Sequence, residues 1–358
     1  MNENYLLYNE MAKKLYFEYA KELPIITLCS QNKSNDFIYN NASEAFLLND
    51  IYKLNAMRDC EIDEKYITGD ASDYEKFKAF CSVLPKFAGH PLYIISHIEL
   101  EKYFDCQIEI NESNAEIIWN HVNNKINSDT LTETKLLEKT NVHLHKLFEY
   151  FYPVELEKNY ISDLASLETD IITKIRNANE VGCKVANSDV IHDFIKPNPY
   201  SANEAIKKIK NNIKLTSDES TLLEMQIART FFKEIKTNNW TLLIPAYAKM
   251  NSDAIRYLKD NDLMPNTVVN FVFEANDSIS DIESALRTYC RNYPLGRSAL
   301  TLYSNNQKLS YAQHEHFRRA FCTVLGKWIE NGEYTSDETI LKKLIEDTLY
   351  NNLKEAIG

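Results

Sequence analysis

The fold is decided by the sequence at residues 216–248, which is TSDESTLLEMQIARTFFKEIKTNNWTLLIPAYA. Thr216 and Glu219 have the spacing of a capping box, which starts a helix. The apolar residues that follow have helical spacing and lie at Leu223, Ile227, Phe231 and Ile235. Residues 240–248 are then a short apolar run, which is typical of a buried strand. This stretch predicts an amphipathic helix followed by a buried strand.

Short apolar runs and amphipathic helices alternate along the rest of the chain. Further strands are predicted at residues 23–29, 142–147, 267–273 and 299–304. Helices are predicted at residues 5–20, 160–180, 204–213 and 338–356, and residues 40–135 are mostly helical without a clear strand. Apolar strands separated by helices are typical of a parallel sheet that helices cover. We therefore predict an α/β fold.

Two of these helices have a well-defined apolar face. The first face contains Ile206, Ile209 and Ile213. The second belongs to a helix near the end of the chain and contains Phe317, Ala320, Phe321, Val324, Leu325 and Trp328. Positions with this spacing meet on one side of a helix, so both faces are predicted to contact the core.

The composition excludes several classes of protein. The formal net charge is -12 and the isoelectric point is about 5.3, which disfavours a nucleic-acid binder that neutralises phosphates. No apolar run approaches the roughly 18 residues that a membrane span needs, and the N-terminus does not have the pattern of a signal peptide. Seven scattered cysteines without a C-x-x-C pair favour reduced thiols and a cytoplasmic location. Only 7 glycines occur, which disfavours a Gly-rich nucleotide loop.

Helix-covered parallel barrels carry their chemistry at the carboxyl ends of the strands. Those ends are predicted at residues 29–31, 187–189, 245–247 and 304–306. The side chains there are mainly amides, hydroxyls and a thiol, and no metal-binding or nucleotide-binding motif is present.

Three long blocks carry a resemblance to a known family. They are residues 50–77 (DIYKLNAMRDCEIDEKYITGDASDYEKF), 89–104 (GHPLYIISHIELEKYF) and 309–334 (LSYAQHEHFRRAFCTVLGKWIENGEY). In this order they resemble blocks of the bacterial uronate isomerases, also called glucuronate isomerases, of the amidohydrolase superfamily. The resemblance implies a TIM-like barrel derived from the (β/α)8 fold, with a large helical insertion after the first strand.

The same resemblance implies that the barrel is distorted or incomplete. Two family segments, a Thr-Thr-Asp-Asp-Pro loop and a tryptophan-rich strand, lack a counterpart, which predicts the loss of one or two βα units. We expect a single domain over residues 1–358. Within it, residues 35–135 form the helical insertion, and residues 136–358 form the remaining barrel and the C-terminal helices.

Members of the family interconvert a sugar acid, such as D-glucuronate or D-galacturonate, with its 2-keto isomer at a divalent metal. The resemblance implies that the metal positions are replaced. The family's His-x-His corresponds to Cys29 and Gln31, its Asp-His to Asn187 and Ser188, a further His to Pro245, and the Asp of its Asp-Ser-Arg to Ser304. Amides and proline are poor partners for a transition metal, so no cofactor is expected. Zinc or another divalent metal is expected only if the chain is an enzyme.

Two functional hypotheses follow. In the first, the chain is a non-catalytic binding or structural homologue, a pseudoenzyme. In the second, it is an active sugar-acid isomerase, or an enzyme of altered activity with a remodelled site. A small sugar acid is the expected ligand, no nucleic acid or membrane is expected as a partner, and a homo-oligomer is compatible with the sequence.

Four residues are candidates for holding an anionic ligand. They are Lys53, Arg58, His97 and Arg318. For the three cations the alternative is an internal ion pair, and for His97 it is a packed, hydrogen-bonded ring. His143 and His145 share one face of a strand, as a metal site requires, but no third ligand is identified. His314 and His316 are more simply interpreted as members of a structural polar cluster, and Cys29 is a weak candidate nucleophile without an evident His partner.

Overall fold

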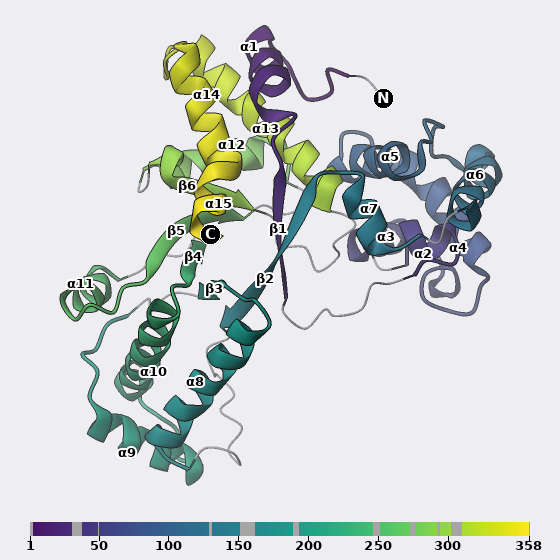
Figure 1. The fold of residues 1–358 in the computed structure, drawn as a ribbon. Helices are drawn as coiled ribbons and strands as arrows, with labels where there is room; N and C mark the ends of the chain where they lie inside the picture. Colours follow the sequence, from purple (N-terminus) through teal and green to yellow (C-terminus); the bar gives the residue numbers. More distant parts are fainter. Residues whose placement is uncertain are drawn as a thin grey trace.

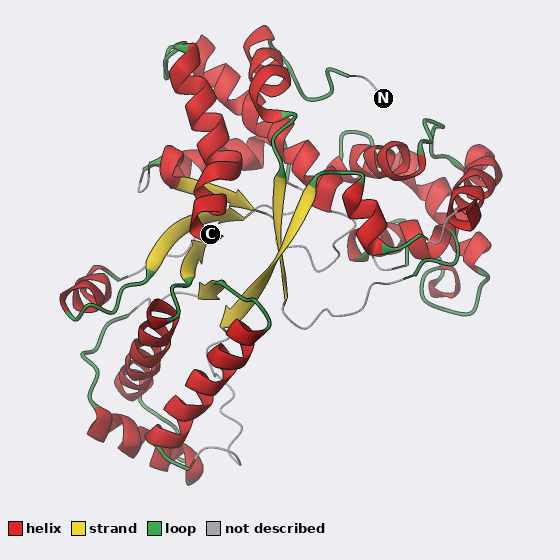
Figure 2. Cartoon of the chain, viewed as in Figure 1, coloured by secondary structure: helices red, strands yellow, loops and turns green. Residues whose placement is uncertain are grey.

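The chain folds around one parallel sheet (Figures 1 and 2). The computed structural model describes residues 3–30, 38–48, 50–128, 131–150, 162–188, 193–245, 251–272, 277–291, 294–301 and 310–357. The six strands in these ranges are β1 (Ile25–Ser30), β2 (Val142–Tyr150), β3 (Val185–Ser188), β4 (Thr241–Pro245), β5 (Asn266–Val272) and β6 (Ser298–Thr301). Every ladder is parallel, and the strands lie side by side in chain order.

This strand order places the connecting helices on one face of the sheet. Crossovers between neighbouring parallel strands are almost always right-handed, so consecutive crossovers all return over the same face. Leu242 and Ile244 of β4 accordingly pack in one cluster with residues of α8 (Leu164–Glu180) and α10 (Ser217–Thr237). Leu243 faces the other way, into a separate cluster with residues of other strands. A sheet with helices outside and apolar side chains inside is the wall of a barrel.

The barrel is open in the part of the chain that the structure describes. β1 and β6 approach each other but form no ladder between them. Six described strands are two fewer than a complete (β/α)8 barrel has. Between β5 and β6, residues 277–291 contain the helix α12 (Ile279–Cys290) and no strand. The architecture therefore agrees with the predicted shortened barrel.

The C-terminal segment closes the amino-terminal end of the barrel. It contains a π-helical turn (Asp347–Asn351) and α15 (Asn352–Ile357), and Leu353 packs inside the barrel. Asn352 Nδ2 donates to the carbonyl oxygen of Ser298, the first residue of β6, at 2.8 Å. The carbonyl oxygen of Ala356 accepts from Thr241 Oγ1, at the start of β4. These contacts make the segment the floor of the barrel.

The helical insertion between β1 and β2 has its own core. Its helices are α2 (Ala42–Phe46), α3 (Ile51–Asp59), α4 (Asp73–Val83), α5 (Pro91–Phe104), α6 (Ala115–Ser128) and α7 (Glu133–Glu138). Figure 1 shows these helices grouped beside the barrel, and their buried residues form one cluster from Tyr39 to Leu136. Because side chains of this region bury one another, the insertion is a separate packing unit.

Two helices at the ends of the chain pack together on the barrel. They are α13 (Ser310–Glu330) and the N-terminal helix α1 (Glu10–Lys14), which continues as a π-helix (Leu15–Ala20). The predicted apolar face of α13 is buried in the cluster that it shares with the N-terminal helix. α14 (Glu338–Glu346) covers the same region.

Several sequence expectations need correction. Ile213 is 53% exposed and follows α9 (Pro199–Lys210), because the helix ends before it reaches the third isoleucine. The N-terminal helix begins at Glu10, where Asn9 caps it, and not at residue 5. α11 (Ser252–Asp260) and α12 were not predicted, and β3 was anticipated only through its end.

Candidate functional site at the carboxyl ends of the strands

The backbone places several predicted positions at one edge of the sheet. Cys29 lies next to the end of β1, Asn187 and Ser188 end β3, and Pro245 ends β4. Because all ladders are parallel, these ends lie at the same edge. Gln31 and Ser304 lie outside the described residues. Among the assigned metal positions, the structure describes only the side chain of Asn187.

Asn187 is central to this edge. It pairs with Glu149 of β2 on one side and with Leu243 of β4 on the other. Its Oδ1 atom is buried and has no hydrogen-bond partner among the described residues. A buried amide oxygen without a partner costs about 1–3 kcal/mol. The edge therefore contains an acceptor that a ligand, a water molecule or a cation could satisfy.

The donor set does not fit the metal centre that the resemblance implies. Transition metals in proteins are held by imidazole, thiolate and carboxylate groups. The six assigned positions offer one thiol, two amides, two hydroxyls and a proline. No group of three His, Cys, Asp or Glu side chains that could hold a metal occurs in the described ranges. A neutral amide oxygen such as Asn187 Oδ1 suits a hard cation or a hydrogen-bond donor better than zinc.

The His143 and His145 pair lies away from the carboxyl edge. In the register of β1 and β2, His143 is opposite Ile26, at the amino half of both strands. The His143 side chain is exposed, and its Nε2 atom is 3.2 Å from Asn141 Oδ1. Nothing of the His145 side chain is described. A ring that binds a neighbouring asparagine at the wrong end of the strand gives no support to a metal site.

Lys53 is held inside the helical insertion. Its side chain is fully buried, and its ammonium forms ion pairs with Glu99 and with Asp50, whose Oδ2 atom is 3.3 Å away. It also donates to the carbonyl oxygen of Phe46 at 2.8 Å and lies 3.8 Å from the centre of the Phe46 ring. Asp50 additionally caps α3. These contacts agree with the alternative to ligand binding, in which Lys53 forms an internal ion pair.

Arg58 and His97 are also occupied by protein groups. Arg58 is on the surface of α3 and binds Glu64 with two nitrogens, at 2.8 and 3.1 Å. The ring of His97 bridges two backbone groups, with Nδ1 2.7 Å from the Tyr93 oxygen and Nε2 accepting from the Ile110 amide at 3.1 Å. His97 therefore fixes the chain after α5, which agrees with the packed-histidine alternative.

Arg318 positions the start of β1. Its guanidinium donates to the carbonyl oxygens of Ala20, Leu23 and Pro24, at 3.2, 2.6 and 2.7 Å. Burial lowers the pKa of Arg318 to about 10. Three carbonyl oxygens in the turn before a strand need donors, and this side chain supplies them. Arg318 is thus a structural residue of the barrel wall.

The other polar residues of α13 form a buried cluster with the N-terminal segment. Arg319 binds Glu315 at 2.8 Å, and Glu315 also accepts from the Tyr16 hydroxyl. His316 Nδ1 is 2.8 Å from the Tyr5 hydroxyl, whereas His314 Nε2 is 3.3 Å from Thr27 Oγ1. These contacts agree with the interpretation of His314 and His316 as members of a structural cluster.

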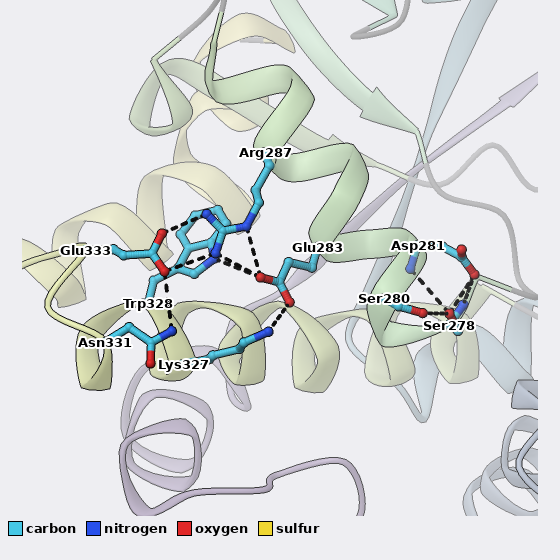
Figure 3. A network of polar contacts seen from close by, with 9 residues as sticks. All are labelled: Ser278, Ser280, Asp281, Glu283, Arg287, Lys327, Trp328, Asn331 and Glu333. Carbon is cyan, nitrogen blue, oxygen red and sulfur yellow. Dashed lines mark hydrogen bonds and ion pairs between the residues drawn. The ribbon is translucent and has the colours of Figure 1, made fainter.

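Two cavities lie away from the carboxyl-edge positions. One, of about 700 Å³, lies between the N-terminal segment and the starts of α5 and α12. Figure 3 shows the polar network beside it, in which Glu283 binds Lys327 and Arg287, and Ser278 caps α12. The other, of about 710 Å³, lies between α5 and α13. Sequence reasoning missed both, because residues from several distant segments line each of them.

The curved parallel sheet with helices outside defines a barrel-derived α/β protein, and solved structures share this fold. The uronate isomerase of Thermotoga maritima superposes with a TM-score of 0.80 at 20% identity, covering 100% of this chain and 99% of that chain. The glucuronate isomerase of Caulobacter crescentus superposes with a TM-score of 0.79 at 13% identity, covering 100% and 96%. The predicted fold is confirmed.

The chain belongs to the glucuronate isomerase family, whose profile matches residues 1–149 and 268–356. The uronate isomerase of Caldanaerobacter subterraneus subsp. tengcongensis is 27% identical over 461 residues, covering 100% of this chain and 99% of the relative. That of Caldicellulosiruptor bescii is 28% identical over 462 residues, with the same coverage. Since this chain has 358 residues, stretches of both relatives have no counterpart here. The predicted family is confirmed.

The family profile divides the assigned metal positions into two groups. Cys29, Gln31 and Ser304 lie within the matched residues, whereas Asn187, Ser188 and Pro245 lie in residues 150–267, which the profile does not match. The family profile therefore matches the two ends of the barrel wall but not its middle. No helix in the described residues combines the length and the apolar character that a bilayer crossing demands.

Proposed function

We propose that this chain is a non-catalytic member of the glucuronate isomerase family, a binding or structural homologue in the cytoplasm. The observation that carries the proposal is the donor set at the carboxyl edge. There, the thiol of Cys29, the amide of Asn187 and the ring of Pro245 stand where the family resemblance implies histidine and aspartate.

A loss of the metal would remove most of the catalytic power. The isomerisation moves a proton between adjacent carbons, and the developing oxyanion needs an electrophile. Neither an amide nor a hydroxyl replaces the charge of a divalent cation there. Lys53, Arg58 and Arg318 each bind other groups of the protein, so that none of them is left free to hold a substrate carboxylate. These contacts support the same proposal.

The test combines metal analysis with an activity assay. The chain is purified, loaded with zinc or manganese, desalted and analysed for bound metal, and D-glucuronate and D-galacturonate turnover are then measured. The uronate isomerase of Caldanaerobacter serves as the positive control in both assays. We expect less than a stoichiometric amount of metal and no turnover above the uncatalysed rate. Near-stoichiometric metal together with turnover that a chelator abolishes would refute the proposal.

The second candidate is a sugar-acid isomerase with a remodelled site, or an enzyme of altered activity. It is favoured by alignments that cover the whole chain with uronate isomerases, and by the unpartnered Asn187 oxygen at the strand edge. This candidate predicts turnover of a sugar acid that Asn187→Ala reduces while circular dichroism remains unchanged. Turnover that is equal in both proteins would exclude a role for this edge.

A further inference from the structure

The cavity of about 710 Å³ lies where the helical insertion meets the barrel. Lys21 lines it from the end of the N-terminal helix, Lys102 from α5, and Lys139 from the turn before β2. Lys21 and Lys139 precede β1 and β2 by a few residues, so this cavity is at the amino-terminal edge of the sheet. It is therefore at the opposite edge from the carboxyl-end positions. Figure 1 shows α5 and α13 near the ends at which the chain enters β1 and β2.

The carboxylates of this cavity already have partners. Asp105 forms an ion pair with Lys125 at 2.9 Å, and Glu315 forms one with Arg319 at 2.8 Å. Glu101 accepts a hydrogen bond from the side-chain amide of Gln107 at 2.9 Å. Two of the three negative charges are thus compensated by cations other than the three lysines.

Among the described residues, the three lysines have no such ion-pair partner. Lys21 lies 5.5 Å from the centre of the Phe17 ring, and Lys102 lies 4.9 Å from the centre of the Tyr311 ring. Lys139 donates to the carbonyl oxygen of Tyr103 at 2.9 Å. None of the three forms an ion pair within 4.0 Å with a residue that the structure describes. The lining of the cavity thus has four cations and three carboxylates, an excess of one positive charge in a protein whose net charge is -12.

We propose that this cavity binds a small polyanion, a metabolite with two or more carboxylate or phosphate groups, through Lys21, Lys102 and Lys139. Lysine binds such groups as a point charge with three donors. Three cations from three segments suit a ligand with several anionic groups better than a ligand with a single negative charge. The cavity volume is within the range of about 300–1,000 Å³ that small-molecule sites occupy. This site is independent of the proposed loss of catalysis.

Such a ligand would connect three parts of the molecule. Lys21 belongs to the N-terminal helix, Lys102 to the insertion, and Lys139 to the segment that enters the sheet. Binding would neutralise like charges and hold the insertion against the barrel. Because a ligand that binds only the folded state raises stability by mass action, binding should also raise the melting temperature.

The test is a calorimetric titration of the full chain with inorganic pyrophosphate and, separately, with citrate at low ionic strength. These two probes distinguish a phosphate ligand from a carboxylate ligand. We expect at least one of them to bind with a dissociation constant of about 0.1 mM or below, and more weakly at high salt. Absence of binding by both probes at about 10 mM would overturn the proposal.

Variants test whether the three lysines form the site. The triple variant K21Q/K102Q/K139Q should bind the probe at least about tenfold more weakly and lose the shift in melting temperature. The control is Lys214→Gln, which removes one exposed lysine between α9 and α10 and should leave binding unchanged. If the triple variant does not fold, the single variants replace it, and each should weaken binding. Equal affinity in the wild type and in the lysine variants would show that the probe binds elsewhere.

Discussion

Lys53 contributes to stability through its buried ion pairs with Asp50 and Glu99. Replacing it with methionine keeps the apolar stem but leaves Asp50 and Glu99 buried without their cation. Breaking a buried pair in this way costs about 3–5 kcal/mol, because an uncompensated charge remains in a medium of low dielectric constant. We expect Lys53→Met to lower the free energy of unfolding by this amount in urea titrations.

The matched control for Lys53 is Arg58, five residues further along the same helix. Its ion pair with Glu64 is largely exposed, and such pairs contribute about 0–1 kcal/mol. Arg58→Met should therefore change the unfolding free energy little. If both variants are equally stable, the Lys53 cluster is not a determinant of stability.

The buried histidines of α13 make stability depend on pH. Burial, and for His314 also the nearby Arg318, lowers the pKa of His314 to about 3 and that of His316 to about 4. An unfolded histidine titrates near 6.5, so the unfolded chain binds more protons below that pH. This contribution to stability is complete above about pH 6.5 and falls by about 1.4 kcal/mol per pH unit for each histidine toward the folded pKa.

We expect the free energy of unfolding to fall between pH 6.5 and 5, where most carboxylates are still ionised. Urea titrations at several pH values measure this slope. In His314→Gln the slope should be smaller, because one of the two buried rings is absent. His143→Gln, which changes an exposed ring, should keep the wild-type slope. A slope unaffected by His314→Gln would show that this ring does not control the acid sensitivity.

For the four candidate ligand-binding residues, the sequence predicted the side-chain charge but not the groups that each side chain contacts. Sequence identified the charges of Lys53 and Arg318, but not that Glu99 and three carbonyl oxygens bind them. Partners 46 residues away for Lys53, and almost 300 residues away for Arg318, become neighbours only through tertiary packing. A charged side chain that binds a ligand and one that forms an internal contact cannot be distinguished by their sequence pattern.

At the level of elements, the crossing of α1 and α13 depends on Gly326. A Cβ atom added there would lie 2.7 Å from Asn9 Oδ1 and 2.9 Å from the amide nitrogen of Ala12. The backbone of α1 cannot move away without loss of the Asn9 cap. Alanine improves helix propensity by about 1 kcal/mol, but overpacking of this kind costs about 1–3 kcal/mol.

We therefore expect Gly326→Ala to destabilise the chain despite its better helix propensity, and Gly326→Val to destabilise it more. Thermal and urea unfolding measure both effects. Gly296→Ala is the control, because a Cβ there would meet only a leucine methyl group at 3.4 Å. A Gly326→Ala protein more stable than the wild type would show that the two helices separate easily.

Helices with strong local signals were predictable, and those without them were not. The capping box of Thr216 and Glu219 exists as predicted, and the apolar face that follows it is buried. α11 was missed because it has only nine residues, although its apolar residues have helical spacing. β3 has four residues, too few for a strand pattern of its own.

At the level of the whole molecule, Leu353 links the floor of the barrel to its wall. Its side chain packs with Ile26, Leu28, Val185 and Leu243 inside the barrel. Truncation of a buried leucine to alanine costs about 2–5 kcal/mol. We expect Leu353→Ala to lower the unfolding free energy within this range, measured by urea titration. Ile340→Ala in α14, where the side chain is 48% exposed, should have a much smaller effect. Equal effects would show that the floor is not packed against the wall.

The sequence predicted the class of the fold because apolar strands and helical faces alternate along the chain. The family resemblance also predicted the insertion, and the two family segments that lack a counterpart predicted the shortening. The candidate site was less predictable. Cys29 and Pro245 are placed by the backbone alone, and the family profile does not match the middle of the wall, which includes Asn187 and Pro245.

The position of the floor has a consequence for synthesis. Residues that seal the barrel, such as Leu353, leave the ribosome only after all the described strands of the wall have emerged. Until then, the apolar interior of a nascent chain is open to water and to other chains, which favours aggregation or chaperone binding. A product that stops before Leu353 would keep that exposed interior permanently. Cellular quality control can therefore distinguish a copy of this protein that contains α15 from one that lacks it.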